Sequence, residues 1–321
     1  MPTTQNLKQH TIGWIGTGHM GFPMAERLLK AGCDLTAYNR TRAKAEPLTQ
    51  AGARIVDAPA DLADRDVVFI MVSASKDLQD VALGPRGVLT GARAPKILVD
   101  CSTVSREASQ AVRAAAEKRG TVMLAAPVSG NGKVVKAGRL GVVASGPRAA
   151  YDAVLPYLEA IGAGVTYVGE GELARMVKIC HNVMLGIVAQ TLAEITVLAE
   201  KGGVPRHAFL DFINKSVMGS TFTRYKTPAY VKLDFTPLFT PLLLRKDLDL
   251  GLQAARELEV PLPTAAGVRE ILQSLIGNGF TDCDFAALIL HQAKASNLKI
   301  VPEDVPVSDG LEPVQAAAHR G

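Results

Sequence analysis

The chain has few cysteines, and their spacing argues against the usual cysteine chemistries. There is no CxxC pair and no Cys/His cluster with metal-ligand spacing. Each cysteine is therefore expected to be a small core residue in a reducing compartment. We predict no metal site. The four cysteines are Cys33, Cys101, Cys180 and Cys283.

The chain also lacks a block of Lys or Arg, because its basic residues are scattered and its formal net charge is only +4. Without such a block, or aromatic residues interleaved with it, a nucleic-acid partner is not expected. The first ten residues lack the apolar stretch of a signal peptide. No run of about eighteen apolar residues suggests a membrane span. We therefore expect a soluble cytoplasmic protein with no membrane partner.

What the sequence does contain is a glycine-rich stretch at residues 11–29, between an apolar strand-like run and a helix-like segment. This is the context that a dinucleotide-binding G-x-G-x-x-G requires. Gly16 permits the tight turn, Gly18 lets a pyrophosphate approach the backbone, and Gly21 lets the helix pack on the strand. Free N–H groups at the helix start would then face the phosphates. The predicted cofactor-binding residues of this loop are Gly16, Gly18, His19, Met20 and Gly21.

The residues after the second predicted strand indicate which cofactor is preferred. An acidic residue about twenty positions after the glycines would bind the ribose 2′-hydroxyl of NAD. This chain has Asn39, Arg40 and Thr41 there instead. Arg40 can bind a 2′-phosphate with two parallel hydrogen bonds, which predicts NADP, with NAD possible. The alternative is a solvated arginine at a strand end.

Strand-like and helix-like segments alternate through the first half of the chain. Continuous apolar runs at 66–72 and 97–100 are typical of strands covered on both faces. The alternation predicts an α/β fold, a doubly wound parallel sheet whose ligands bind beyond the carboxyl ends of the strands. Polar residues at or after such ends are Asn39, Ser73, Thr103 and Ser129. Further expected strands are 34–41, 54–56, 122–124, 140–144 and 165–168, and expected helices are 43–51 and 106–118.

After residue 170 the pattern becomes helical. Residues 173–201 are apolar almost all round, so this helix should be buried on most sides. Further helices are expected at 207–214, 241–258, 265–276 and 284–295. We therefore predict a dinucleotide-binding Rossmann domain at 1–170, an all-helical substrate and dimerisation domain at 171–300, and a flexible tail at 301–321.

Lys178 lies on the apolar helix between Val177 and Ile179, where an uncompensated charge is costly. His181 and Asn182 follow at helical spacing and share roughly one face with it. A lysine in an apolar pocket has a lowered pKa and can act as an acid or base near neutral pH. The alternative is a lysine whose stem packs at the helix start while its amine reaches solvent.

Five motifs in order make the chain resemble the β-hydroxyacid dehydrogenase family, which includes 3-hydroxyisobutyrate dehydrogenase and tartronate semialdehyde reductase. The resemblance extends to about residue 295. Its motifs are I-G-T-G-H-M-G-F-P-M-A at 15–25, D-C-S-T at 100–103, A-P-V-S-G at 126–130, G-x-G at 169–171 with Lys178 and Asn182, and K-D-L at 246–248.

The resemblance implies a fold, a reaction and roles. It implies an NAD(P)-dependent oxidoreductase that interconverts a short 3-hydroxy acid and its semialdehyde by hydride transfer. Lys178 would be the general acid/base, and Asn182 would hold the substrate beside it. Substrate binding falls to Ser129, Gly130 and Asn131. Cofactor binding beyond the glycine loop falls to Asn39, Arg40, Thr41, Val72, Ser73, Thr103 and Lys246.

This sequence departs from the family pattern at several site positions, which leaves the substrate open. Asn131 stands where the family usually has glycine, His181 where it has asparagine, and Ser73 where it has proline. We expect a small carboxylic acid substrate and a homodimer or homotetramer. Two alternatives remain: an imine reductase, and a non-catalytic NADP-binding protein. Both groups generally lack the lysine that this chain has at 178.

Overall fold

The computed structural model describes residues 6–311, which divide into two compact units. The first unit ends at Lys178 and the second begins at Ile179. The boundary expected from the sequence lies a few residues earlier, between 170 and 171, just before helix α6 (Leu173–Lys201). In the structure the first turns of α6 are part of the first unit.

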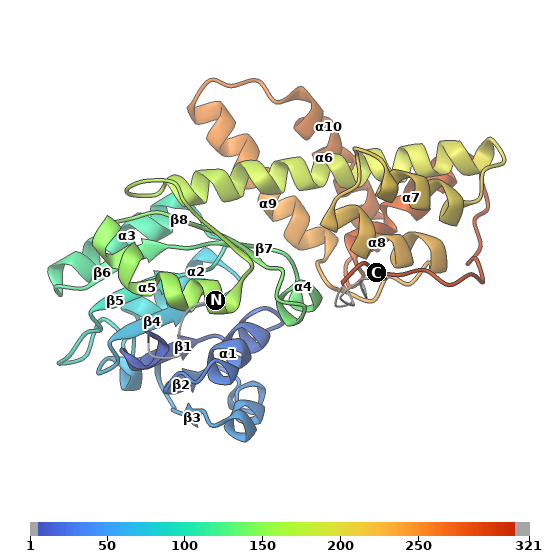
Figure 1. Cartoon of the computed structure of the whole chain (residues 1–321). Helices are drawn as coiled ribbons and strands as arrows, with labels where there is room; N and C mark the ends of the chain where they lie inside the picture. Colours follow the sequence, from blue (N-terminus) through green and yellow to red (C-terminus); the bar gives the residue numbers. More distant parts are fainter. Residues whose placement is uncertain (1–5, 312–321) are drawn as a thin grey trace. The chain divides into compact units, whose positions relative to one another are not determined.

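Six parallel strands form the main sheet of the first unit, in the order β3-β2-β1-β4-β5-β6 (Figure 1). Every residue of β1 and β4 is buried, as the continuous apolar runs predict. This order defines a doubly wound dinucleotide-binding fold, so the predicted fold class is confirmed. The strands are β1 (Ile12–Ile15), β2 (Leu35–Tyr38), β3 (Arg54–Ile55), β4 (Val67–Ile70), β5 (Ile97–Asp100) and β6 (Val122–Ala125).

The last strands expected from the sequence belong to a second sheet. This sheet has the order β7-β8-β9, with β7 antiparallel and β9 parallel to β8. Its strands are β7 (Val128–Ser129), β8 (Gly141–Ala144) and β9 (Gly164–Tyr167). After β6 the chain turns at Pro127, whose carbonyl accepts the Val143 N–H, and one bridge between Ala125 and Ser145 joins the two sheets. Apolar periodicity reveals a strand but not the sheet in which it pairs.

In the described part of the first unit, residues 6–178, five helices precede α6, and of these α1 and α3 match segments expected from the sequence. The helix expected at 43–51 is wrong, because residues Arg42–Lys44 and Glu46–Ala51 form two short 3₁₀ segments. Pro47 lacks the N–H that a continuous α-helix needs there. Further 3₁₀ turns lie at Asn6–Lys8 and Pro59–Leu62. The helices are α1 (Gly21–Lys30), α2 (Ser75–Leu83), α3 (Arg106–Lys118), α4 (Gly132–Lys136) and α5 (Arg148–Ile161).

The second unit is helical, and among residues 6–311 no strand follows β9. Its core is formed by side chains of all its helices, α6 to α11, and of one 3₁₀ turn, with Tyr230, Leu248 and Phe285 almost fully buried. Its remaining elements are α7 (Arg206–Lys215), α8 (Thr221–Lys232), α9 (Pro241–Glu257), α10 (Pro263–Gly277), α11 (Leu288–Ala295) and a 3₁₀ turn at Phe285–Ala287.

Helix α6 is less buried than its sequence suggests. Met184 is 65% exposed and Leu198 is 72% exposed. The expectation that all four cysteines are core residues also fails here, because Cys180 on α6 is exposed. By length and hydropathy alone α6 would be long enough to cross a membrane, and half of its most apolar window is buried inside the protein. The core helix of a soluble protein can be equally long and apolar, so these two properties alone are weak evidence for a membrane span.

The structure describes residues 301–311 of the segment that was expected to be a flexible tail, 301–321. The Glu303 N–H donates to the Val231 carbonyl, and the Glu303 carboxylate accepts the N–H groups of Arg206 and His207 at the start of α7. Leu311 is buried. Residues 312–321 lie outside the described part of the chain.

Candidate active site

The glycine loop after β1 is held in shape by backbone constraints and by the single tryptophan. Gly16 has φ +94°, and a Cβ there would lie 2.2 Å from the Met71 carbonyl oxygen. A Cβ on Gly21 would lie 2.0 Å from the Gly16 oxygen. Trp14, fully buried, donates its indole N–H to that same Gly16 oxygen at 2.8 Å. Residues other than glycine at 16 and 21 would therefore displace the loop.

Gly18 is different, because among the described residues no atom other than those of its chain neighbours lies within 4 Å of a Cβ built on it. Gly18 is exposed, and a glycine at this position of the loop lets a ligand come close to the backbone. The Thr17 N–H next to it donates to the Asn39 side-chain oxygen at 2.9 Å. Asn39 therefore ties the glycine loop to the end of β2.

A cavity of about 380 Å³ opens at the carboxyl ends of β1, β2 and β4. This is where ligands bind in doubly wound sheets. Of the predicted cofactor residues it is lined by Gly16, Gly18, Asn39, Arg40, Thr41, Val72 and Ser73. His19, Met20, Gly21, Thr103 and Lys246 do not line it.

Arg40 is an exposed cation in the wall of this cavity. Its Nη1 lies 3.1 Å from Oδ1 of Asp77 on α2, and its side chain is 84% exposed. Sequence reasoning missed two further cations in the wall, Lys44 and Arg86. Lys44 follows the Asn39-Arg40-Thr41 motif by a few residues, which is the only sequence signal for it. Arg42, by contrast, pairs with Asp57 at 2.5 Å and is absent from the wall.

The loops after β4 and β5 are bonded to each other. The Val72 N–H donates to the Ser102 hydroxyl at 2.9 Å, and the Ser102 N–H donates to Asp100 Oδ1 at 3.0 Å. Thr103, the predicted cofactor residue, follows directly and is half-buried. The neighbouring Cys101 is fully buried, and burial raises the pKa of its thiol, so it is a core residue as expected.

The predicted substrate loop begins on β7 and lies beside the glycine loop. Ser129 pairs with Gly141 of β8, and Gly130 has φ +138°, so a side chain there would be strained. A Cβ on Gly132 would lie 2.9 Å from the His19 oxygen. Asn131 is buried, and its Oδ1 caps α4 by accepting the N–H groups at positions 133 and 134 at 2.9 and 3.1 Å.

Lys178 is the last residue of the first unit and is only 9% exposed. It lies on α6 three residues after Arg175, whose side chain is bonded to the last residue of β5 and to the loop after it. The unit that holds the dinucleotide cavity thus also holds a buried lysine.

In the second unit, α6 and α9 bring Asn182 and Asp247 together. Asn182 is 3% exposed, and its Nδ2 donates to Asp247 Oδ2 at 2.5 Å. Its Oδ1 lies 3.0 Å from His181 Nδ1. Asp247 also pairs with Lys246 at 3.2 Å. Sequence reasoning missed Asp247 as the partner of Asn182, although it belongs to the K-D-L motif.

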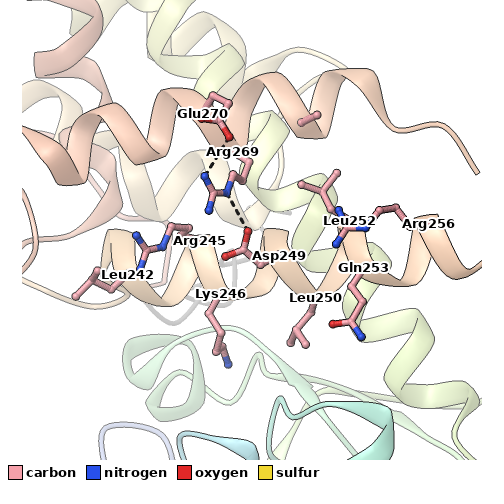
Figure 2. Close-up of a pocket in the computed structure, with 11 residues that line it drawn as sticks. Leu242, Arg245, Lys246, Asp249, Leu250, Leu252, Gln253, Arg256, Arg269 and Glu270 are labelled. Atoms are coloured by element: carbon pink, nitrogen blue, oxygen red, sulfur yellow. Dashed lines mark hydrogen bonds and ion pairs between the residues drawn. The ribbon is translucent and has the colours of Figure 1, made fainter.

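Lys246 also lines a second, larger cavity of about 870 Å³ between α9 and α10. Figure 2 shows Lys246 on the side of α9 turned away from Arg269 and α10. Arg269 pairs with Asp249 at 2.9 Å and with Glu270 at 3.0 Å. Among residues 6–311 no group of three or more His, Cys, Asp or Glu side chains could hold a metal ion.

These features fit a bound dinucleotide. The glycine at position 18 leaves room for a pyrophosphate, and three cations in the wall can meet phosphate groups. The fold and this cavity define a dinucleotide-binding protein with a Rossmann domain followed by a helical unit.

Comparisons with known proteins identify the family. Residues 11–169 match the NAD-binding domain of 6-phosphogluconate dehydrogenase, and residues 172–291 match the NAD-binding domain of NADP-dependent 3-hydroxyisobutyrate dehydrogenase. The chain is 31% identical to glyoxylate/succinic semialdehyde reductase 2 of Arabidopsis thaliana, over 89% of this chain and 80% of that protein. It therefore belongs to the β-hydroxyacid dehydrogenase family and is an NAD(P)-dependent oxidoreductase.

Solved structures of similar proteins support the same family assignment. A 3-hydroxyisobutyrate dehydrogenase from Salmonella typhimurium superposes with a TM-score of 0.79 at 26% identity, covering 87% of this chain and 99% of that one. Psf3, solved in complex with NADP+ and 2-OPP, gives the same TM-score, identity and coverage. The chain also matches the cytokine-like nuclear factor N-PAC of Homo sapiens at 33% identity over 86% of this chain, but it spans only 50% of that longer protein.

Proposed function

We propose that this enzyme interconverts a short 3-hydroxy acid and its semialdehyde with NADP(H), using Lys178 as general acid/base. The observation that carries the proposal is the buried Lys178, 9% exposed, on α6 in the unit that holds the dinucleotide cavity. A protonated lysine amine can donate its proton to a carbonyl oxygen that gains negative charge during reduction.

A nicotinamide cofactor held by the loops that line the cavity would supply the hydride for the carbonyl carbon. Lys178 donates its proton to the carbonyl oxygen in reduction and takes it back in oxidation. The Asn182 amide is held by Asp247 and His181, and we assign it to the substrate oxygen beside Lys178. Ser129 and Gly130 would bind the carboxylate. The Asn131 Oδ1 atom already caps α4. Asn131 would therefore bind the substrate through its amide nitrogen, as a hydrogen-bond donor.

Candidate substrates are 3-hydroxyisobutyrate, tartronate semialdehyde and succinic semialdehyde. The name of the Arabidopsis relative, a glyoxylate/succinic semialdehyde reductase, supports testing the last of these together with glyoxylate. The proposed NADP preference is supported by Arg40 in the cavity wall and by the NADP+ bound to Psf3.

The test is a panel in which 3-hydroxyisobutyrate is assayed with NADP+ and NAD+, and the semialdehydes and glyoxylate with NADPH and NADH. Each acid is compared with its methyl ester. We expect turnover of the free acids and at least tenfold less of the esters, since removing one partner of a charged hydrogen bond costs about 1.5–3 kcal/mol. Equal turnover of acids and esters would exclude a carboxylate site. Activity on cyclic imines alone would favour an imine reductase. NADPH binding without any turnover would favour a non-catalytic protein.

We also propose a cytoplasmic homodimer or homotetramer that binds neither nucleic acid nor membrane. Large apolar side chains exposed in the second unit support self-association, among them Met184, Leu198 and Phe212. Light scattering at micromolar concentration tests this, and a clean monomer would contradict it.

A further inference from the structure

The start of α6 carries a buried arginine that bonds to three different groups. Arg175 is 2% exposed. Its Nε donates to Glu172 Oε2 at 2.8 Å, its Nη1 to the Ser102 carbonyl at 3.0 Å, and its Nη2 to Asp100 Oδ2 at 2.6 Å. One acceptor, Asp100, is the last residue of β5, and Ser102 lies in the loop that follows. The guanidinium therefore joins α6 both to the end of β5 and to the loop after it.

Glu172, one of the two carboxylates that accept from Arg175, accepts further hydrogen bonds. Glu172 also accepts hydrogen bonds from the Ser109 hydroxyl and from Arg113 Nε, both at 2.7 Å. Burial raises the pKa of Glu172, but Arg175, Ser109 and Arg113 together outweigh it and leave the pKa below its usual value. The network thus contains two guanidinium groups and two carboxylates, and its buried charge is compensated.

From Asp100 the bonding continues into the cofactor loops. Asp100 uses one oxygen for Arg175 and the other for the Ser102 N–H, and the Ser102 hydroxyl accepts the Val72 N–H. Val72 lines the dinucleotide cavity. A chain of hydrogen bonds therefore runs from the cavity wall to Arg175, one helical turn before Lys178.

We propose that Arg175 is a positioning residue that fixes the first turn of α6 to the loops after β4 and β5, and so sets the position of Lys178 relative to the bound cofactor. The inference rests on the proposed function of Lys178. A buried ion pair is weak grounds for added stability, since an apolar replacement is often as stable. Positioning of Lys178 is a better explanation for the buried Arg175, because a catalytic group misplaced by about 1 Å can cost roughly 10²-fold in rate.

The first experiment compares Arg175→Gln with Arg206→Gln. Arg206 is a matched control in the second unit: it is fully buried and bonds to Glu200 and to the Tyr230 carbonyl. We expect Arg175→Gln to lower kcat by about 10–10²-fold, with a smaller change in the KM for NADPH. Arg206→Gln should lower Tm and leave kcat nearly unchanged. An Arg175→Gln protein with wild-type kcat, or a similar kcat loss in both variants, would overturn the proposal.

Two variants keep the test informative if Arg175→Gln folds poorly. Arg175→Lys has one nitrogen for three acceptors, so we expect it to fold and to recover only part of the lost kcat. In a Lys178→Met background, Arg175→Lys should reduce the residual rate little further, because its effect passes through Lys178. If the kcat losses of Arg175→Lys and Lys178→Met were fully additive in the double variant, Arg175 would not act through Lys178.

A second readout needs no substrate and therefore separates this inference from the proposed reaction. Hydrogen exchange of the Val72 and Ser102 amides should be faster in Arg175→Lys than in wild type, and unchanged in Arg206→Gln. If the wild type turns over none of the panel, the reaction is wrong, yet faster exchange would still show that Arg175 holds the loops. Unchanged exchange at both amides would refute the positioning role itself.

Discussion

Cofactor choice should depend on Arg40 more than on its neighbour Arg42. Both follow β2, but only Arg40 lines the cavity, whereas Arg42 is paired with Asp57. Replacing Arg40 by Ala removes a cation that can bind a 2′-phosphate and touches nothing that NADH would need. We therefore expect the KM for NADPH to rise and the KM for NADH to stay within about twofold, given one lost charged contact.

In Arg40→Ala, the expected rise in the KM for NADPH lies near the lower end of the range for the loss of a charged hydrogen bond. A hydrogen bond to a charged group contributes about 1.5–3 kcal/mol, or roughly 10–10²-fold. Arg40 is 84% exposed and already pairs with Asp77, so part of its charge is screened. Lys44 and Arg86 remain in the wall after the substitution. We expect about a tenfold rise in the KM for NADPH.

The assay is steady-state kinetics with both cofactors for Arg40→Ala, the control Arg42→Ala, and Asp77→Asn. Arg42→Ala should behave like wild type. Asp77→Asn should bind NADPH at least as well as wild type, because it releases Arg40 from a competing carboxylate. An equal loss with NADPH and NADH in Arg40→Ala would mean that Arg40 only supports the loop. An NADPH defect in Arg42→Ala would place the 2′-phosphate elsewhere.

Three further predictions follow from single contacts. Lys178→Met should lower kcat by about 10²–10⁴-fold in stopped-flow assays while circular dichroism stays unchanged, and near-normal turnover would refute the assignment. Gly251→Ala should destabilise the second unit by about 1–3 kcal/mol in urea titrations, because its Cβ would lie 2.1 Å from Val183 Cγ2. The hydrogen bond from Lys96 and that from the Thr11 N–H lower the pKa of Asp66 to about 2. Since this pKa is depressed on folding, the stability that Asp66 adds is present above about pH 4 and is lost as the pH falls toward 2. The urea midpoints of wild type and Asp66→Asn should therefore converge over that interval, and a constant difference would contradict the reasoning.

Features set by local spacing could be predicted from the sequence. The glycine loop, the Asn39-Arg40-Thr41 turn and the long helix α6 all depend on residues close together in the chain. Gly16, Gly18, Asn39 and Arg40 do line one cavity. The parallel sheet followed from alternating apolar segments, and the strand order confirmed it.

Features set by distant partners could not be predicted. Arg175 meets Ser102 and Asp100 across 73 and 75 residues, and Asn182 meets Asp247 across 65 residues. No periodicity links such positions, because their pairing depends on how whole elements pack. For the same reason the sequence indicated strands at 140–144 and 165–168 without revealing that they form a separate sheet.

That separate sheet has an evolutionary consequence. The Ser129–Gly130 loop follows β6 and is anchored on β7, which pairs with β8 in the three-stranded sheet. The loops that line the dinucleotide cavity are anchored on the six-stranded sheet. Under the proposed function, mutations in the small sheet can reshape the acid-binding loop while the cofactor loops keep their register. Selection can thus change the accepted acid and retain the cofactor.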